Sequence, residues 1–403
     1  KDSNNLREAR NYIKRIRANG GTNIHDALVE AMRQPPTPKM LPLTIFLTDG
    51  LPTVGITAEA RIRKAVVETN VHKRRIFSFG VGFDLNAPLL TSISSATRAT
   101  PTFVFPNENV EAKVSQVFNR LSGPVLAEPR LATIDGSGAV TTRAVRELLP
   151  NELNDLFEGD QLVVLGQYQS DEPLHFRLSG NYLGAPRTFD LKFDLSKATV
   201  RNAFVPRLWA SRKIARLVEV ITEAGAENTA SNYARNASAN AAGYSSAAMR
   251  PPASAGLDDP KLKELVDEII RLSTEYGVLT EYTAFLATDG TDLNNLEALN
   301  GRARESLVNN AQNVRSGMGG VTQASNNAIQ MSQSNVSRYN GYMAQNMERV
   351  EITTVQQITD RTFFKRNNRW VDSNALKKES AKPDRVIEFG TPEFYKLADQ
   401  LLR

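Results

Sequence analysis

The segment Leu43-Thr44-Ile45-Phe46-Leu47-Thr48-Asp49-Gly50 decides the fold, because an apolar run of strand length ends there in a carboxylate and a glycine. Such a run predicts a buried strand of a parallel sheet. Ligand sites of open α/β sheets lie beyond the carboxyl ends of the strands. Asp49 therefore lies where a ligand would bind.

A second segment, Gly20-Gly21-Thr22-Asn23-Ile24, predicts a glycine-hinged turn before a helix. From this turn the Thr22 hydroxyl could converge on Asp49. Hard oxygen ligands without imidazole or thiolate suit Mg²⁺ or Ca²⁺. The alternative is that Thr22 caps a helix and Asp49 is a solvated loop carboxylate. Taken together with the strand, the two residues favour a metal site.

Residues 1–122 alternate between helical and strand patterns. This alternation predicts a partial Rossmann-like domain, in which a parallel sheet is covered by helices. The predicted helices cover Asn5–Arg17, His25–Met32, Ala58–Asn70 and Val110–Leu121, and the predicted strands cover Leu43–Thr48, Arg75–Val81 and Thr102–Phe105.

From residue 123 to 290 the pattern predicts an antiparallel, β-sandwich-like domain with packed helices. The predicted strands are Arg130–Ile134, Gln161–Tyr168, Leu174–Leu178, Thr188–Phe193 and Val278–Ala287. Two amphipathic helices, Pro206–Thr222 and Pro260–Tyr276, are expected to pack on this domain. Residues 223–256 are rich in Ala, Ser and Asn and are expected to form the loop between them.

Two further segments complete the multidomain α/β plus β organisation. Residues 291–348 are rich in Asn, Gln, Ser and Gly, which predicts a polar low-complexity linker. Residues 349–403 predict a small β-rich tail, with a hairpin turn at Asn367-Asn368 and a terminal helix from Pro392 to Leu402. This tail would either pack back on the β-domain or form an appendage.

Composition and missing motifs exclude several classes of function. The 403 residues include no cysteine and carry a scattered net charge of +5, without a nucleic-acid-binding motif. No run approaches the 18 to 20 apolar residues of a transmembrane segment. The sequence lacks GxSxG, GxxxxGK[ST], HExxH and GxGxxG. A hydrolase in the β-domain would need a nucleophile beside a base, and the sequence offers no such pair. We therefore expect neither an enzyme nor a nucleic-acid-binding protein.

The segments GGTNIHDAL, TIFLTDGLPT and RIFSFGVG, which starts at Arg75, resemble the second half of a von Willebrand factor type A domain. The resemblance implies a metal site (MIDAS) built from a DxSxS motif after the first strand, with a threonine and an aspartate from two later loops. Thr22 and Asp49 match these two later positions. DxSxS does not occur upstream of them. We therefore expect an N-terminally truncated domain, which binds Mg²⁺ or Ca²⁺ only if the parent protein supplies the missing segment.

Three later segments extend the resemblance to about residue 290. LFEGDQLVV (156–164), RLWA (207–210) and STEYGVLT (273–280) resemble the region after the type A domain in inter-alpha-trypsin inhibitor heavy chains and their bacterial relatives. The resemblance implies an upstream VIT domain, and the cysteine-free composition favours a bacterial origin. No DPHF motif occurs, so hyaluronan transfer is not expected, and protease inhibition is not implied.

The function that the sequence favours is non-enzymatic binding or adhesion outside the cytoplasm (periplasmic, cell-surface or secreted). In the intact parent, a divalent ion would leave one coordination position open for a carboxylate of a protein partner. The alternative is a structural scaffold of a cell-envelope or extracellular assembly without a functional metal.

Overall fold

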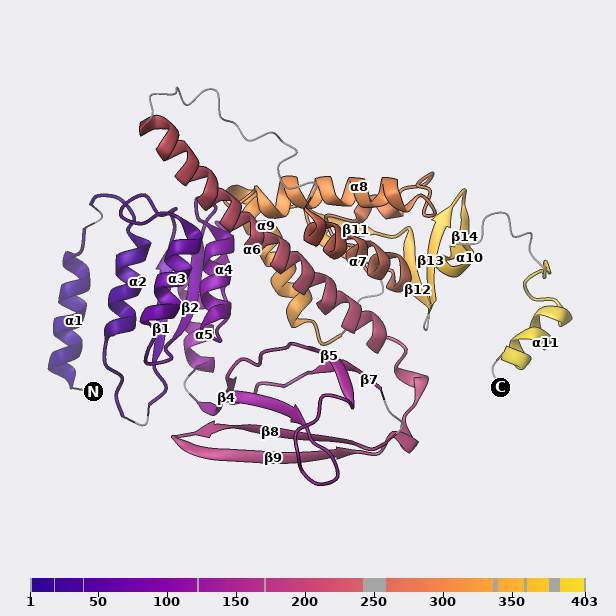
Figure 1. Cartoon of the computed structure of the whole chain (residues 1–403), viewed down its shortest axis with the longest axis horizontal. Coiled ribbons are helices and arrows are strands. Elements are labelled where there is room, and N and C mark those ends of the chain that lie inside the picture. Colours follow the sequence, from indigo (N-terminus) through magenta and orange to yellow (C-terminus); the bar gives the residue numbers. More distant parts are fainter. Residues whose placement is uncertain are drawn as a thin grey trace.

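A computed structural model describes residues 2–17, 19–38, 40–121, 123–169, 172–241, 259–335, 340–358, 361–376 and 385–401. It places an α/β unit at one end, antiparallel sheets beneath, a body of long helices and a β-rich tail (Figure 1). Among the described residues, no helix is both long enough and apolar enough to cross a bilayer.

The α/β unit contains the predicted parallel sheet. Its strands are β1 (Leu43–Thr48), β2 (Arg75–Val81) and β3 (Thr102–Val104), hydrogen-bonded in that order. Its helices are α1 (Ser3–Arg15), α2 (Ile24–Arg33), α3 (Glu59–Thr69), α4 (Ala87–Ala96) and α5 (Val110–Arg120). The parallel register pairs Thr48 at the end of β1 with Gly80 of β2. The predicted fold class is therefore confirmed.

Helices cover the sheet on two faces. Buried side chains of α2, α3 and α4 form one cluster, which includes Leu28, Ile62 and Ile93. Side chains of α5 pack into a second cluster that contains Phe77 and Phe79 of β2. Helix α4, which is capped by the Asn86 side chain, was not predicted from the sequence. The sheet is thus held between helical layers, and the carboxyl ends of its strands all lie at one edge.

The second part is made of antiparallel strands, as predicted. One sheet has the strand order β6-β4-β8-β9, and a separate pair is formed by β5 and β7. These strands are β4 (Pro124–Thr133), β5 (Val145–Leu149), β6 (Leu156–Phe157), β7 (Leu165–Tyr168), β8 (Leu174–Tyr182) and β9 (Ala185–Phe193). The turns η1 (Leu195–Lys197) and η2 (Val200–Asn202) lead from β9 into the helical body.

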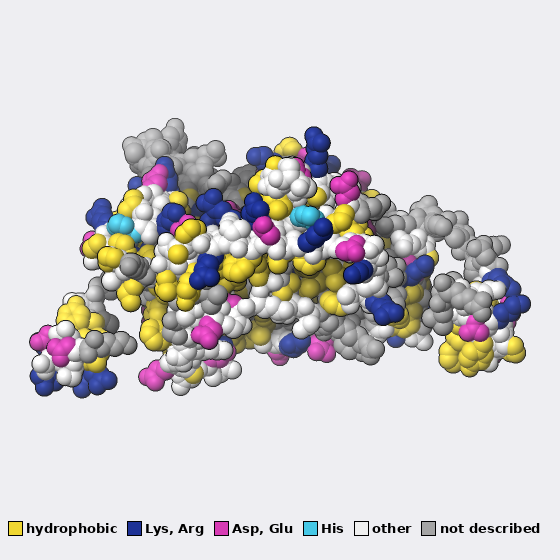
Figure 2. Space-filling view, turned by 90° about the horizontal axis from the view of Figure 1, so that it is seen from below, with side chains coloured by type: hydrophobic (Ala, Val, Ile, Leu, Met, Phe, Trp, Pro, Cys, Tyr) yellow, Lys and Arg dark blue, Asp and Glu magenta, His cyan; other side chains and the backbone are white. Residues whose placement is uncertain are grey.

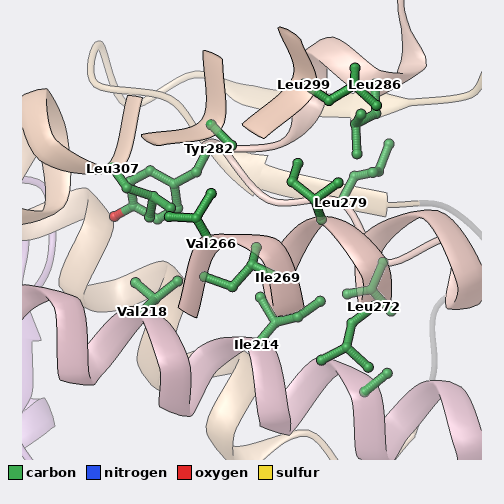
Figure 3. Packing of buried hydrophobic residues seen from close by; sticks show 14 of the residues in the cluster. Ile214, Val218, Val266, Ile269, Leu272, Leu279, Tyr282, Leu286, Leu299 and Leu307 are labelled. Carbon is green, nitrogen blue, oxygen red and sulfur yellow. The ribbon is translucent and has the colours of Figure 1, made fainter. Parts of the chain in front are cut away.

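The largest core belongs to the helical body rather than to the sheets. The elements are α6 (Val205–Ala241), α7 (Pro260–Tyr276), η4 (Ala284–Ala287), α8 (Leu296–Leu307), the π-helical η5 (Val308–Gln312) and α9 (Gly317–Ser332). Figure 3 shows Ile214 and Val218 of α6 facing Val266 and Ile269 of α7. The expected loop 223–256 is wrong as far as Ala241, because α6 continues to that residue. Residues 242–258 lie outside the described part.

The expectation of a polar linker at 291–348 is also wrong for the described residues. The segment forms α8, η5 and α9. Leu299, Ala303 and Leu307 follow one another at helical spacing and are buried in the main core. Small residues allow close helix contacts here: a Cβ added to Gly225 of α6 would lie 2.5 Å from the backbone oxygen of Gln312. The low content of large apolar residues was therefore not evidence of a linker.

The segment 278–287, predicted as a strand, forms a turn followed by η4. Tyr282 and Leu286 in this segment are buried in the main core. A short apolar run cannot be assigned to a strand or to a buried turn from periodicity alone.

The tail has the predicted strands and terminal helix. Its elements are β10 (Asn340–Met343), β11 (Arg349–Ile352), β12 (Val355–Ile358), β13 (Arg361–Arg366), β14 (Arg369–Asp372), α10 (Ser373–Leu376) and α11 (Pro392–Leu401). Asn367 and Asn368 form the turn between β13 and β14, both with positive φ. Val355 and Phe364 are buried in the core of the helical body. The strands therefore pack on the helices and not on the β-rich sheet, whereas α11 lies apart (Figure 1).

Candidate site at the carboxyl edge of the parallel sheet

The loop before α2 fits closely against the loop that follows β1. The Thr22 amide donates to the Thr53 hydroxyl at 2.8 Å, and the amides of Thr53 and Val54 donate to the Thr22 carbonyl at 2.9 and 3.1 Å. A Cβ at Gly21 would lie 2.6 Å from side-chain atoms of both Thr53 and Val54. Glycine is therefore required at this close approach, and the predicted turn is present.

The Thr22 side chain lies against the end of β1. A Cβ added to Gly50 would lie 3.4 Å from Thr22 Oγ1 and 4.0 Å from the carbonyl oxygen of Asp84. The hydroxyl of Thr22 thus lies close to the residue directly after Asp49. The structure brings the two predicted site segments to the same edge of the sheet, together with the loop that follows β2.

Asp49 and Asp84 are both exposed at this edge. Within the described part of the chain, no hydrogen bond or ion pair is made by the Asp49 carboxylate. The hydroxyl and carboxylate donors are of the kind that Mg²⁺ and Ca²⁺ prefer. However, the described residues contain no group of three or more His, Cys, Asp or Glu side chains that could hold a metal ion. These oxygen ligands are therefore of the right chemical kind for Mg²⁺ or Ca²⁺, but they are too few to enclose the ion.

The first turn of α2, which follows Thr22, carries a third carboxylate, that of Asp26. The ring nitrogen Nδ1 of His25 lies 2.7 Å from Oδ1 of Asp26. This histidine hydrogen bond, together with one from Asn23, holds the pKa of the Asp26 carboxyl below its ordinary value. Asp26 is therefore already engaged within its own helix turn, whereas Asp49 is not.

The loop after β2, which carries Asp84, is held by the junction between η5 and α9, a feature that the sequence analysis missed. The Gly317 amide donates to the Phe83 carbonyl at 2.9 Å, and the Ala87 amide donates to the Arg315 carbonyl at 3.2 Å. The Arg315 guanidinium also forms a largely buried ion pair with Glu59 of α3. These partners are 256 residues apart in the sequence, so no local pattern could reveal them. The helical body thereby fixes one loop of the candidate site.

Comparison with known proteins agrees with this architecture. Residues 2–102 match the family model of the von Willebrand factor type A domain. The mouse inter alpha-trypsin inhibitor, heavy chain 4, is 28% identical over 242 residues, which cover 55% of this chain and 25% of that protein. The human inter-alpha-trypsin inhibitor heavy chain H6 is 28% identical over 239 residues, which cover 53% of this chain and 18% of that protein. The chain thus spans a quarter or less of these relatives.

Among solved structures, a von Willebrand factor type A protein from Catenulispora acidiphila has 17% identity and a TM-score of 0.39, covering 68% of this chain and 65% of that one. The ArnB paralog VWA2 from Sulfolobus acidocaldarius has 12% identity and a TM-score of 0.29, and the match covers 76% of this chain and 71% of that one. The predicted type A family is confirmed for residues 2–102, and the predicted likeness to the heavy chains is confirmed by the sequence matches. The upstream VIT domain and the bacterial origin stay predictions.

Proposed function

We propose that this chain is part of a non-enzymatic binding protein, which recognises a protein partner at the carboxyl edge of its parallel sheet. The observation that carries the proposal is the convergence of the Thr22 hydroxyl with the end of β1, where the Asp49 carboxylate is exposed and unpaired among the described residues. Homology to inter-alpha-trypsin inhibitor heavy chains supports a binding role rather than catalysis.

The recognition chemistry would be supplied by a divalent cation, Mg²⁺ or Ca²⁺. Thr22 and Asp49 would hold it directly or through water, and the resemblance assigns the remaining ligands to a DxSxS segment of the parent protein. A cation at an exposed edge can accept a carboxylate oxygen from a partner, which gives strong and geometrically selective contacts. The unpaired state of Asp49 supports this role, because no protein cation among the described residues competes for its charge.

Calorimetric titration of Mg²⁺ into the full-length parent protein tests the proposal. We expect the Asp49→Ala variant to bind Mg²⁺ at least about tenfold more weakly, because a charged ligand is lost. The Thr22→Val variant should lose affinity while keeping the shape of the side chain. Asp399→Ala serves as the matched control, because this exposed carboxylate lies on α11, away from the sheet edge (Figure 1). Equal affinities of wild type and Asp49→Ala would overturn the role of Asp49.

A second candidate function is a scaffold of a cell-envelope or extracellular assembly without a functional metal. It is favoured by the lack of a three-residue acidic or histidine cluster among the described residues. It is also favoured by the ion pairs that lock the α/β unit to the rest of the chain, such as Arg75 with Asp155 and Arg315 with Glu59. A parent protein that binds no divalent cation in the titration would establish this second candidate over the first.

Both candidates place the protein outside the cytoplasm, on the strength of the likeness to the heavy chains. Cell fractionation of the source organism, followed by immunoblotting, tests this location. Recovery of the full-length protein in the cytoplasmic fraction alone would contradict it.

A further inference from the structure

Strand β9 forms a free edge of the antiparallel sheet. In the described part of the chain, β9 is hydrogen-bonded only to β8, and all nine of its residues are exposed. In Figure 1 it is the lowest strand of the molecule, and only the loop between β4 and β5 reaches below it. An exposed strand of this length offers its unpaired backbone groups to another strand.

The β8–β9 hairpin has one apolar face, which is only half covered. Its register pairs Leu174 with Phe193, Phe176 with Leu191 and Leu178 with Phe189. The three β9 members of these pairs keep 51%, 43% and 48% of their surface exposed, in that order. Figure 2, which views the side of the molecule where β8 and β9 lie in Figure 1, shows hydrophobic side chains gathered across the middle of this side. This apolar face is therefore available to a partner.

The opposite face of the hairpin carries charges in a fixed order. Arg177 donates two hydrogen bonds to the carboxylate of Asp190, at 2.7 and 2.9 Å. Lys192, two residues further along β9, lies opposite His175. Asp190 and Lys192 therefore project from the same face of the edge strand, one negative and one positive.

The turn of the hairpin determines which backbone groups of β9 point outward. Leu183 and Gly184 both have positive φ, at 51° and 83°, and they connect the pair Tyr182 and Ala185. This is a two-residue type I′ turn, whose closing pair exchanges hydrogen bonds. Every second residue from Ala185 then bonds to β8, and the residues between them point their N–H and C=O groups outward. Thr188, Asp190 and Lys192 belong to the outward set.

Pro186 also belongs to the outward set. Proline lacks an N–H group, and in sheets it is confined to positions where no ladder bond is required, such as the outer side of an edge strand. Its position agrees with the orientation derived from the turn.

We propose that a second copy of this chain docks on β9 as an antiparallel strand, with the two-fold axis at Leu191. In this register Asp190 lies opposite Lys192 of the second copy, and the same pair occurs again across the axis. Phe189 lies opposite Phe193, so the apolar faces of the two hairpins become continuous. The outward N–H and C=O groups of Asp190 and Lys192 face one another and can complete the ladder.

Charge selects this register over its neighbours. An axis at Asp190 would place this carboxylate opposite its own copy, and an axis at Lys192 would oppose two ammonium groups. An axis at Phe189 would place Leu191 opposite Arg187. Like charges directly opposite one another destabilise a sheet, and opposite charges stabilise it. The self-complementary edge therefore fits a second copy of this chain, and the interaction does not depend on Thr22 or Asp49.

Cysteine cross-linking tests the register directly, because the chain contains no cysteine. In the Leu191→Cys variant the two thiols face one another across the axis, in the closer type of antiparallel pair. In the Phe189→Cys variant the two thiols lie four residues apart along the strand, about 13 Å. We expect Leu191→Cys to form disulfide-linked dimers about tenfold faster than Phe189→Cys under mild oxidation. An equimolar mixture of Phe189→Cys and Phe193→Cys should form mixed dimers.

Charge exchange provides an independent measurement by sedimentation. Asp190→Lys and Lys192→Asp should each be monomeric, whereas an equimolar mixture should form a dimer, because every facing pair is then opposite in charge. Arg177→Gln is the matched control: it breaks the same intrachain ion pair as Asp190→Lys but leaves β9 intact, so it should dimerise like the wild type. Equal cross-linking rates for Leu191→Cys and Phe189→Cys, or a mixture of the charge variants that stays monomeric, would overturn the proposal.

Discussion

The buried ion pair between Arg75 and Asp155 predicts a large loss of stability when the carboxylate is removed. Arg75 begins β2, and its guanidinium donates to both oxygens of Asp155, at 2.5 and 3.1 Å. Only 3% and 1% of the two side chains are exposed. The same carboxylate accepts the Glu128 amide at 2.8 Å. Asp155→Ala therefore leaves both a buried charge and a backbone donor without their partner.

Removing one member of a buried ion pair costs about 3–5 kcal/mol. Glu128 Oε1 lies 4.0 Å from the Arg75 guanidinium and can take up part of its charge. We therefore expect Asp155→Ala to lower the free energy of unfolding by about 3 kcal/mol, the lower end of that range. The assay is urea unfolding followed by circular dichroism at neutral pH, with the free energy taken from the transition of the α/β unit.

The Lys64–Glu68 pair on α3 supplies the matched control. Its side chains are 73% and 63% exposed, and its charged atoms are 3.7 Å apart. Glu68→Ala should cost less than about 1 kcal/mol, because water screens an exposed pair. If Asp155→Ala costs no more than Glu68→Ala, the reasoning from burial is refuted.

Three further predictions concern pH, a close backbone contact and the tail. Burial raises the pKa of the Glu281 carboxyl to about 7. Protonation of this carboxyl therefore contributes stability that is fully present below its ordinary pKa of 4.5 and is lost as the pH rises through 7. The free energy of unfolding of Glu281→Gln should therefore vary less between acidic and neutral pH than that of the wild type, by roughly 3 kcal/mol, and identical pH profiles would contradict this. Gly21→Ala should cost about 1–3 kcal/mol because its Cβ would lie 2.6 Å from the facing loop, whereas Gly136→Ala, with open space, should be neutral in the same unfolding assay. Phe364→Ala should cost about 3–5 kcal/mol through the cavity it leaves in the helical core, far more than Phe118→Ala on the exposed side of α5; equal costs would show that the tail does not share that core.

The parallel sheet could be predicted because its signals are local. The strand Leu43–Thr48 is a short apolar run with its turn residues directly after it, and the glycine-hinged turn before Thr22 uses residues suited to a close approach. The Asn367-Asn368 turn was predictable for the same reason. The β8–β9 hairpin, in contrast, turns at Leu183-Gly184, beyond the predicted strand end at Leu178. The sequence also predicted that Thr22 could approach the end of β1 from its glycine-hinged turn, and Thr22 Oγ1 lies near Gly50.

The helical body could be predicted only in part. The helices Pro206–Thr222 and Pro260–Tyr276 were expected from their amphipathic patterns, whereas the helices of segment 291–348 were not. Segment 291–348 has few large apolar residues, yet α8 and α9 each bury one face. Small side chains allow close approach nearby, as where Gly225 of α6 meets Gln312 of η5. The Arg315–Glu59 ion pair fixes a loop of the candidate site from 256 residues away. Contacts of this kind depend on the completed tertiary structure and leave no periodic pattern.

The central claim is that Thr22 and Asp49 together hold a divalent cation in the parent protein. Its most direct test is an anomalous-diffraction map from crystals of the full-length protein soaked in Mn²⁺, a hard cation that takes the same oxygen ligands as Mg²⁺. We predict a peak within coordination distance, roughly 2–2.6 Å, of Thr22 Oγ1 or its bound water and of the Asp49 carboxylate. A map in which both side chains are clearly defined and no peak lies between them would contradict the account.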